Sequence, residues 1–150
     1  MAITIIMGPT CSGKSHLIKE RFANAKVIDL YDFQGKGFVT VESIWQSYVD
    51  CAEALKQAIK EHKDVVLEHT LLKRIRREWY IEQIREVTTD EIKIICIVPT
   101  VEELLEHAKL RKIYMSKGEA EGMLEILEIP TTDEGYSSIE IIKKQKTEQQ

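Results

Sequence analysis

The eight residues Gly8–Ser15 constrain the fold of this chain more than any other stretch, because they read G-x-x-x-x-G-K-S. An apolar run precedes them directly, and a pattern typical of a helix follows. In this setting the backbone N–H groups of the loop cradle phosphate oxygens, the lysine neutralises the outer phosphates, and the serine ligates Mg²⁺. The motif therefore predicts a nucleoside triphosphate site formed by Gly8, Pro9, Thr10, Cys11, Ser12, Gly13, Lys14 and Ser15.

Length and composition are those of one globular domain. The chain has 150 residues, of which 43% are hydrophobic and 31% charged, and a domain of this size buries roughly 68–70% of its unfolded surface. We expect residues 1–142 to form the domain and residues 143–150 to be a polar tail. The apolar runs are too short to span a bilayer, and no leader pattern is recognisable, so we expect a cytoplasmic protein with no membrane partner.

Charge and cysteine content exclude several classes of protein. A net charge of −4 argues against a protein that wraps long nucleic acid, although a local grip on a strand end or a nucleotide stays open. The cysteines, Cys11, Cys51 and Cys96, are scattered and odd in number, which favours neither a zinc site nor a disulfide framework. We expect Cys51 and Cys96 to be core thiols, whereas Cys11 lies inside the phosphate loop.

Apolar runs alternate with helical patterns along the chain. The helix expected over 72–87 has Ile75, Trp79 and Ile84 facing inward, and the segment 31–38 is a glycine-containing loop. This alternation predicts an α/β fold in which a parallel sheet is flanked by helices and the ligand lies at the carboxyl ends of the strands. Strands are expected over 2–7, 27–30, 64–68, 91–98 and 138–142, and helices over 13–23, 41–59, 72–87, 101–111 and 118–127.

Acidic residues follow two of the expected strands. Asp29 and Asp32 lie at and just past the second strand, and Glu68 ends the third, before His69 and Thr70. A carboxylate after a strand is often only a turn or capping residue. Because these groups converge on one phosphate cradle, we expect Asp32 to be a general base, with Glu68 as the alternative base or a partner of the magnesium site.

Two groups of cations are also candidates. Lys73–Arg77 begins the helix after the third strand, where positive charge opposes the helix dipole. A solvated helix face is one explanation, and contact with an acceptor phosphate is the other. Arg111 ends the helix after the fourth strand, where it either caps that helix or supplies a positive charge to a transferring phosphoryl group.

Several segments together resemble the kinase domain of polynucleotide kinases, which phosphorylate 5′-hydroxyl ends, within the wider group of small P-loop kinases. "VIDLYD" resembles the strand that ends in the catalytic aspartate of that family, at Asp32. "CAEALKQ" and "VVLEHT" resemble the helix and strand that lead to its D-N-T-N or S-D-T-N motif. "VPTVEELLEHAKLR" resembles the segment before its lid arginine, at Arg111, and "IPTTDEGYSSIEI" resembles its P-T-x-x-E-G-[FY] stretch near the adenine site, which includes Pro130 and Thr131.

The resemblance spans about residues 3–142 and implies a three-layer P-loop NTPase fold with a five-stranded, mainly parallel sheet and a short lid. It implies an enzyme that uses ATP and Mg²⁺, with Lys14, Asp32 and Arg111 as catalytic residues. The acceptor would be a 5′-OH end of DNA or RNA. The residues that would hold it are Asp32, Glu68, His69, Thr70, Arg74 and Arg77.

The chain departs from the family at the acceptor motif, where Glu68-His69-Thr70 is followed by Leu71 in place of asparagine. A kinase for a small molecule such as a nucleoside, sugar or antibiotic is therefore an alternative. A nucleotide-gated switch or interaction module is another. The sequence leaves the oligomeric state and the DNA or RNA preference open.

Overall fold

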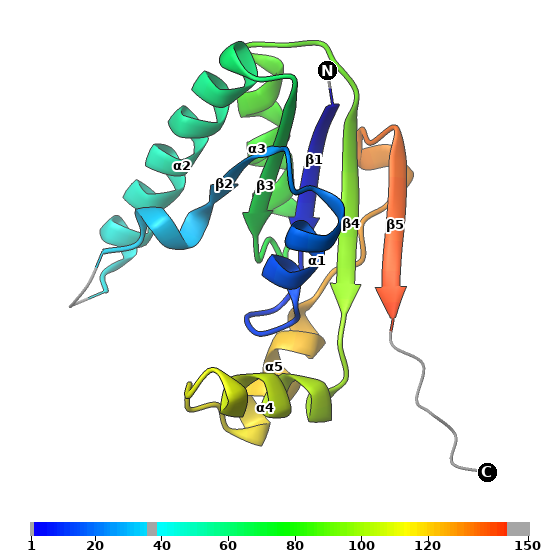
Figure 1. Cartoon of the computed structure of the whole chain (residues 1–150). Coiled ribbons are helices and arrows are strands. Elements are labelled where there is room, and N and C mark those ends of the chain that lie inside the picture. The colour runs from blue at the N-terminus through cyan, green and yellow to red at the C-terminus, as the bar shows by residue number, and fades with distance from the viewer. Residues whose placement is uncertain (1, 36–38, 144–150) are drawn as a thin grey trace.

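The computed structural model describes residues 2–35 and 39–143. The end of the expected loop 31–38, and the expected polar tail except for its first residue, lie outside the described residues. The described elements, in chain order (Figure 1), are β1 (Ala2–Met7), α1 (Lys14–Arg21), β2 (Lys26–Asp29), η1 (Leu30–Phe33), α2 (Val41–Glu61), β3 (Asp64–His69), α3 (Arg74–Arg85), β4 (Ile92–Val98), α4 (Val101–Leu110), α5 (Lys117–Ile126), η2 (Thr132–Glu134) and β5 (Ser138–Lys143).

The five strands form one sheet in the order β2-β3-β1-β4-β5, and every neighbouring pair is parallel. β1 is central, and Ile3, Ile5 and Ile6 are inaccessible to solvent. Their side chains point alternately to both faces, so both faces of the centre of the sheet are covered, as a parallel sheet requires. The predicted α/β class and parallel sheet are confirmed.

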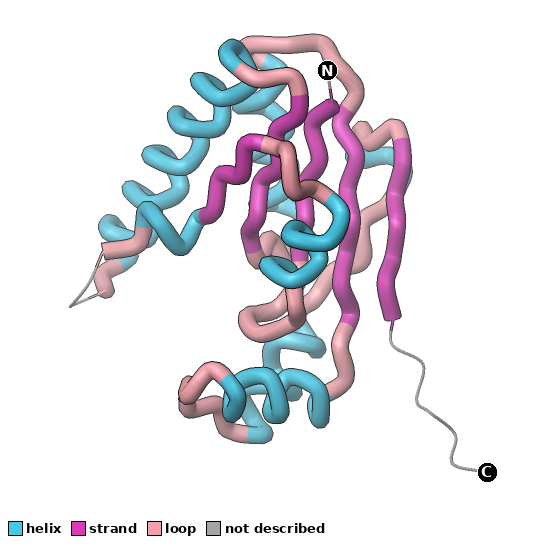
Figure 2. The backbone as a smooth tube through the Cα atoms, viewed as in Figure 1, coloured by secondary structure: helices cyan, strands magenta, loops and turns pink. Residues whose placement is uncertain are grey.

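Helices cover the two faces unequally (Figures 1 and 2). α1 packs on one face over a small cluster that includes Ile6, Ile18 and Ile97. α2 and α3 pack on the other, over the larger core, which includes Leu55 and Tyr80. Cys51 and Cys96 are fully buried in that larger core, as predicted. α4 and α5 pack against each other beyond the carboxyl ends of the central strands.

The N-terminus of α3 differs from the prediction. The helix begins at Arg74 rather than near residue 72, because its N-cap, Lys73, has an extended backbone with φ −99° and ψ 136°. Ile84 is buried as expected, but the inward placement of Ile75 was wrong, since it is 71% exposed. The buried face of α3 is instead formed by Arg77, Tyr80 and Ile84, which are three and four residues apart.

Arg77 is buried because it is paired. Its Nε and Nη2 donate to the two carboxylate oxygens of Glu134 at 2.8 and 3.1 Å, and its Nη1 donates to the Leu71 carbonyl at 2.9 Å. Both side chains are inaccessible to solvent. Burial alone would raise the pKa of Glu134, but Arg77 and the Thr131 N–H hold that pKa below its ordinary value. The ion pair therefore ties the segment before β5 to α3.

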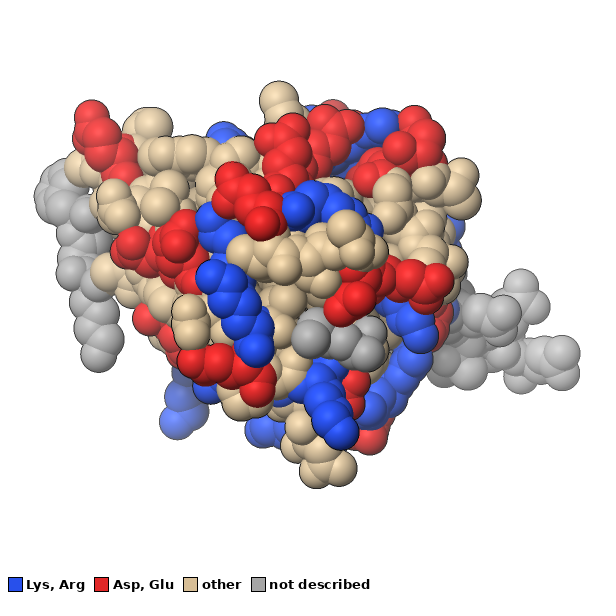
Figure 3. Space-filling view, turned by 90° about the horizontal axis from the view of Figure 1, so that it is seen from above, with Lys and Arg blue, Asp and Glu red and all other residues tan. Residues whose placement is uncertain are grey.

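The view of Figure 3, from above, looks onto the edge at which the strands of Figure 1 begin. Acidic and basic side chains are interspersed over this face rather than gathered into one basic area. Within residues 2–35 and 39–143, no helix has both the length and the apolar character needed to cross a membrane.

We expect the stability of the fold to depend on the buried ion pair between Arg77 and Glu134. Arg77→Leu leaves the Glu134 carboxylate buried without its cation, which should lower the free energy of unfolding by about 3–5 kcal/mol in urea titrations. The double substitution Arg77→Leu with Glu134→Leu should recover much of that loss. Arg74→Leu is the matched control: Arg74 pairs with Glu78 and Asp133 near the surface, where solvent screens the charges, so this substitution should cost far less. Equal losses for Arg77→Leu and Arg74→Leu would contradict the structural role of Arg77.

Candidate active site

The phosphate loop joins the end of β1 to the start of α1, and its backbone geometry explains its glycines. Gly13 has φ 96°, a left-handed conformation that favours glycine, immediately before the first helical residue. A Cβ on Gly8 would lie 2.7 Å from Ser12 Oγ and 3.0 Å from the Ile97 carbonyl, so this position requires a glycine unless its neighbours shift. The loop thus approaches β4 closely and turns directly into the N-terminus of α1.

Lys14 lies inside the loop and folds back onto it. Its ammonium group donates to the carbonyl oxygens of Gly8 and Pro9 at 2.9 and 2.8 Å. Burial lowers its pKa to about 8, against the opposing effect of the negative charges of Glu68 and Asp29. Ser12 Oγ is buried without a hydrogen-bond partner among the described residues. A desolvated cation inside a loop of this kind fits a phosphate ligand.

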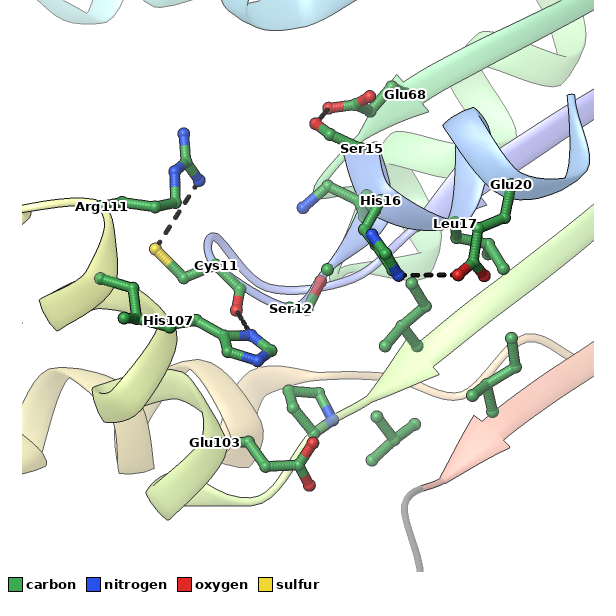
Figure 4. A pocket seen from close by; sticks show the side chains of 17 residues that line it. Cys11, Ser12, Ser15, His16, Leu17, Glu20, Glu68, Glu103, His107 and Arg111 are labelled. Carbon is green, nitrogen blue, oxygen red and sulfur yellow. Dashed lines mark hydrogen bonds and ion pairs between the residues drawn. The ribbon is translucent and has the colours of Figure 1, made fainter. Parts of the chain in front are cut away.

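The Glu68 carboxylate lies beside this loop, because β1 and β3 are adjacent in the sheet. Ser15 Oγ donates to Glu68 Oε2 at 2.9 Å (Figure 4). Glu68 is also the register partner of Asp29 on β2. Burial, followed by the proximity of the Asp29 carboxylate, raises the pKa of Glu68, although the Ser15 hydroxyl and Lys14 act in the opposite direction. Glu68 and Asp29 therefore form a carboxylate pair beside the phosphate loop.

Asp32, the expected base, lies elsewhere. The residues just after β2 form the short helix η1, in which Asp29 accepts a hydrogen bond from the Tyr31 N–H. Asp32 is exposed and, together with Asp29, lines a separate hollow of about 360 Å³ between β2 and α2. Asp29 is the last residue of β2, where it pairs with Glu68, whereas Asp32 lies three residues later in η1. The sequence therefore predicted the region, but the turn of η1 distinguishes the two carboxylates.

α4 closes the opposite side of the site (Figure 4). Arg111 Nη1 lies 3.8 Å from Cys11 Sγ, and His107 Nδ1 donates to the Cys11 carbonyl at 2.9 Å. His107 is not among the residues predicted from the motifs. Its spacing of four residues before Arg111 is the signal that places both on one helix face. Cys11 thus joins α4 to the phosphate loop.

These elements enclose one cavity of about 840 Å³. It brings together the loop residues Cys11–Ser15, Glu68, His107 and Arg111, and it extends beside α1 to apolar side chains of β4 and β5. The apolar lining consists of Leu17, Ile97, Val98, Pro99, Leu110 and Ile142. The cavity therefore combines a cationic, hydrogen-bonding end with an apolar end, as expected for a phosphate-bearing ligand with a flat organic group.

Several expected site residues lie outside this cavity. Arg77 is in the core, and Arg74 donates to Glu78 and Thr131 on the α3 side. Pro130 and Thr131 contribute to the segment held against α3, not to the cavity lining. Glu134 of the same stretch pairs with Arg77, which holds the segment against α3. The expected place of Pro130 and Thr131 at an adenine site stays a prediction.

His69 and Thr70 follow Glu68 but serve different contacts. The Thr70 carbonyl accepts a hydrogen bond from Gly8 N–H at 3.2 Å, which joins the end of β3 to the phosphate loop. His69 turns to the α2–α3 side, where its ring lies 4.8 Å from that of Tyr48. Burial lowers the pKa of His69 to about 3, so its ring is neutral near pH 7.

The donors at the loop fit Mg²⁺ bound together with a nucleotide. A hydroxyl and a carboxylate, Ser15 and Glu68, supply oxygen atoms next to the lysine. Among the described residues, no group of three or more His, Cys, Asp and Glu side chains forms a metal site made by the protein alone. Mg²⁺ commonly uses one or two protein oxygens and completes its shell with substrate phosphates and water. The donor set therefore suits a metal that arrives with the nucleotide.

No protein-family model matches the sequence, and no curated protein matches it. Solved structures do match the fold. A gluconokinase from Sinorhizobium meliloti superposes with a TM-score of 0.68 and 17% identity, over 95% of this chain and 82% of that one. A sugar kinase from a Janibacter species superposes with a TM-score of 0.69 and 16% identity, over 95% and 85% of the two chains.

A third match is a chain of the Pnkp1/Rnl/Hen1 RNA repair complex. It superposes with a TM-score of 0.69 and 15% identity, over 84% of this chain and 43% of that one. At these identities the likeness concerns the fold alone. With the parallel sheet and the phosphate loop at its carboxyl edge, it shows that the chain has the α/β fold of P-loop kinases.

Proposed function

We propose that this protein is a Mg²⁺-dependent kinase that transfers the γ-phosphoryl group of ATP to a hydroxyl. The observation that carries the proposal is one cavity that contains the phosphate loop with Lys14, the Ser15–Glu68 pair and Arg111. A lysine, a metal-binding hydroxyl and an arginine are the groups that phosphoryl transfer requires. The likeness to kinase folds supports the same reaction class.

In this mechanism the loop N–H groups and Lys14 hold the β- and γ-phosphates. Ser15, oriented by Glu68, would hold Mg²⁺, which supplies positive charge to the phosphate oxygens when bound. The acceptor oxygen bonds to the γ-phosphorus as the bond from phosphorus to the β,γ-bridging oxygen breaks, and ADP leaves. Arg111 stabilises negative charge on the transferred group, an effect worth about 10³–10⁵ in rate for arginines in this role.

The proton of the acceptor hydroxyl must pass to a base. We assign it to the carboxylate pair of Glu68 and Asp29, because these groups lie beside the loop and Glu68 has a raised pKa. Asp32 is the alternative base, as the family resemblance implies, and it requires the acceptor to bind nearer to η1.

The acceptor we propose is the 5′-OH end of a DNA or RNA strand. The resemblance of the segments at Asp32, Thr70 and Arg111 to polynucleotide kinases supports it, as does the fold likeness to the RNA repair complex. The second candidate is a small hydroxyl compound, which the gluconokinase and sugar kinase likenesses and the net charge of −4 favour.

Transfer of labelled phosphate tests this proposal. With γ-labelled ATP and Mg²⁺, a 5′-OH oligonucleotide should become labelled and its 5′-phosphorylated twin should not. Ser15→Ala and Glu68→Gln should each lower the transfer rate at least about tenfold, because both groups serve the metal or the reacting hydroxyl. Asp29→Asn and Asp32→Asn form a matched pair of carboxylate variants, and we expect the larger loss for Asp29→Asn.

Three results would change this account. Label on gluconate, sugars or nucleosides, with none on either oligonucleotide, would replace the strand end by the small acceptor. A larger loss for Asp32→Asn would move the base to η1. ATP binding without transfer to any alcohol would contradict the kinase itself.

Because the pKa of Lys14 is lowered, we expect ATP binding to be accompanied by proton uptake. At pH 8.5 the free lysine, with a pKa of about 8, is largely neutral, and bound phosphates should restore its charge. The terminal phosphate of ATP, with a pKa of about 6, is already ionised. ATP binding at pH 8.5 should therefore take up roughly half a proton or more, and affinity should fall as the pH rises through 8.

Calorimetric titrations in two buffers of different ionisation enthalpy measure this uptake. At pH 7 the lysine contribution should be near zero, because the group is charged in both states. Lys14→Arg keeps the positive charge at every pH and should abolish the uptake at pH 8.5. Uptake that persists in this variant would show that Lys14 is not its source.

A further inference from the structure

An aromatic cluster lies on the α2–α3 side of the sheet, next to the end of β3. The Trp45 ring lies 4.8 Å from the ring of Trp79 and 6.4 Å from that of Tyr48. Tyr48 in turn contacts His69, the residue after Glu68. Trp45 is 42% exposed, so one large ring of the cluster reaches solvent. We call Trp45, Tyr48, Trp79 and the neighbouring Arg76 the aromatic surface.

Arg76 differs from the other cations at the start of α3. Lys73 pairs with Glu128, Arg74 with Glu78 and Asp133, and Arg77 with Glu134. Arg76 is exposed, and the described part of the chain gives it no ion pair; its guanidinium lies 5.7 Å from the centre of the Tyr48 ring. A cation in the first turn of a helix opposes the helix dipole. An anionic ligand would offset that unfavourable position.

The aromatic surface and the candidate reaction centre are joined by two consecutive residues at the end of β3. Glu68 accepts a hydrogen bond from Ser15, and the next residue, His69, packs against Tyr48. His69 accepts a hydrogen bond from the Leu71 N–H through Nδ1, so its neutral ring carries the hydrogen on Nε2. That buried Nε2 has no hydrogen-bond partner within the described residues. The surface thus starts at the carboxyl edge of β3 and extends outward over the first turns of α2 and α3.

We infer that the aromatic surface binds the terminal nucleotide of the acceptor, with the base stacked on Trp45 and the phosphate on its 3′ side paired with Arg76. This inference rests on the proposed kinase function. Exposed aromatic rings combined with an arginine are the usual means by which proteins hold unpaired bases. A sugar without a charged group would leave Arg76 without an anion, and so would a purely apolar protein partner.

The remaining charge of the molecule limits the length of strand that is held. With a net charge of −4, the protein has little general attraction for a phosphate backbone. One stacked base and one paired phosphate form a site for a strand end rather than for a long track. A free nucleoside 3′-phosphate carries the same base, 5′-OH and phosphate, so it shares this recognition chemistry with a strand end.

Tryptophan fluorescence tests the inference without any phosphoryl transfer. The chain has two tryptophans, and both belong to the aromatic surface. A 5′-OH oligonucleotide should quench their emission, and Trp79→Phe should keep the quenching because Trp45 remains. An oligonucleotide whose 5′-terminal sugar lacks its base should quench far less. Equal quenching by the two strands, or none by either, would overturn the inference.

Binding of a 3′-labelled oligonucleotide, followed by anisotropy, separates the roles of the two groups. Trp45→Ala should weaken binding about tenfold, the effect of one lost stacking contact, whereas Trp45→Phe should lose less. Trp45→Ala should have no further effect on binding of the strand without a terminal base.

Arg76→Ala should weaken binding of the oligonucleotide and reduce its salt dependence by about one phosphate contact, a slope change of about 0.7. Lys60→Ala, which removes an exposed cation from α2, is the control and should change neither.

Two further measurements identify the ligand and the failure modes. Quenching by a nucleoside 3′-phosphate as strong as that by the strand would identify the terminal nucleotide as the complete ligand. If Trp45→Ala leaves oligonucleotide affinity unchanged but converts a dimer to a monomer in sedimentation, the surface is a protein interface and the inference is wrong. Quenching without label transfer would refute the proposed kinase function but support nucleotide binding at the aromatic surface. Label transfer to an alcohol without quenching would support the kinase function but refute nucleotide binding at the aromatic surface.

Discussion

The parallel pairing of β1 with both β3 and β4 is the constraint on which the candidate site depends. β1 ends in the phosphate loop, so its register with β3 sets Glu68 beside Ser15 and the Thr70 carbonyl beside Gly8 N–H. Its register with β4 brings Ile97 against the same loop. Because these contacts come from three strands, a slip of one residue would turn every side chain of the slipped strand to the other face. The same strand register that forms the centre of the sheet therefore fixes the positions of the loop, Glu68 and Ile97.

The alternation of side chains at the end of β3 directs two consecutive residues to opposite faces of the sheet. Glu68 faces α1 and the loop, while His69 faces α2 and α3. On the first side are the groups suited to phosphate and Mg²⁺, and on the second are the aromatic rings and Arg76. A donor nucleotide and an acceptor nucleotide would then approach the carboxyl edge of the sheet from different sides. In the proposed reaction, these two sides would hold the two substrates.

Much of the fold could be predicted from the sequence because its signals are local. The alternating apolar runs identified all five strands to within one or two residues, and the phosphate loop followed from its motif. Side-chain direction and long-range pairing could not be predicted in the same way. The sequence pattern alone is typical of a surface cation at Arg77, because its partner, Glu134, lies 57 residues later in the chain. The same pair explains why Pro130 and Thr131 lie on α3, and the turn of η1 separates Asp29 from Asp32.

In the proposed reaction the γ-phosphoryl group goes to an alcohol and not to water. The most direct test is turnover of ATP with Mg²⁺ and a 5′-OH oligonucleotide in water enriched in ¹⁸O, followed by mass spectrometry of the strand and of free phosphate. The account predicts a strand that gains one phosphoryl group without heavy oxygen, in amounts equal to the ADP formed. Free phosphate that carries ¹⁸O, with an unmodified strand, would show transfer to water and contradict it.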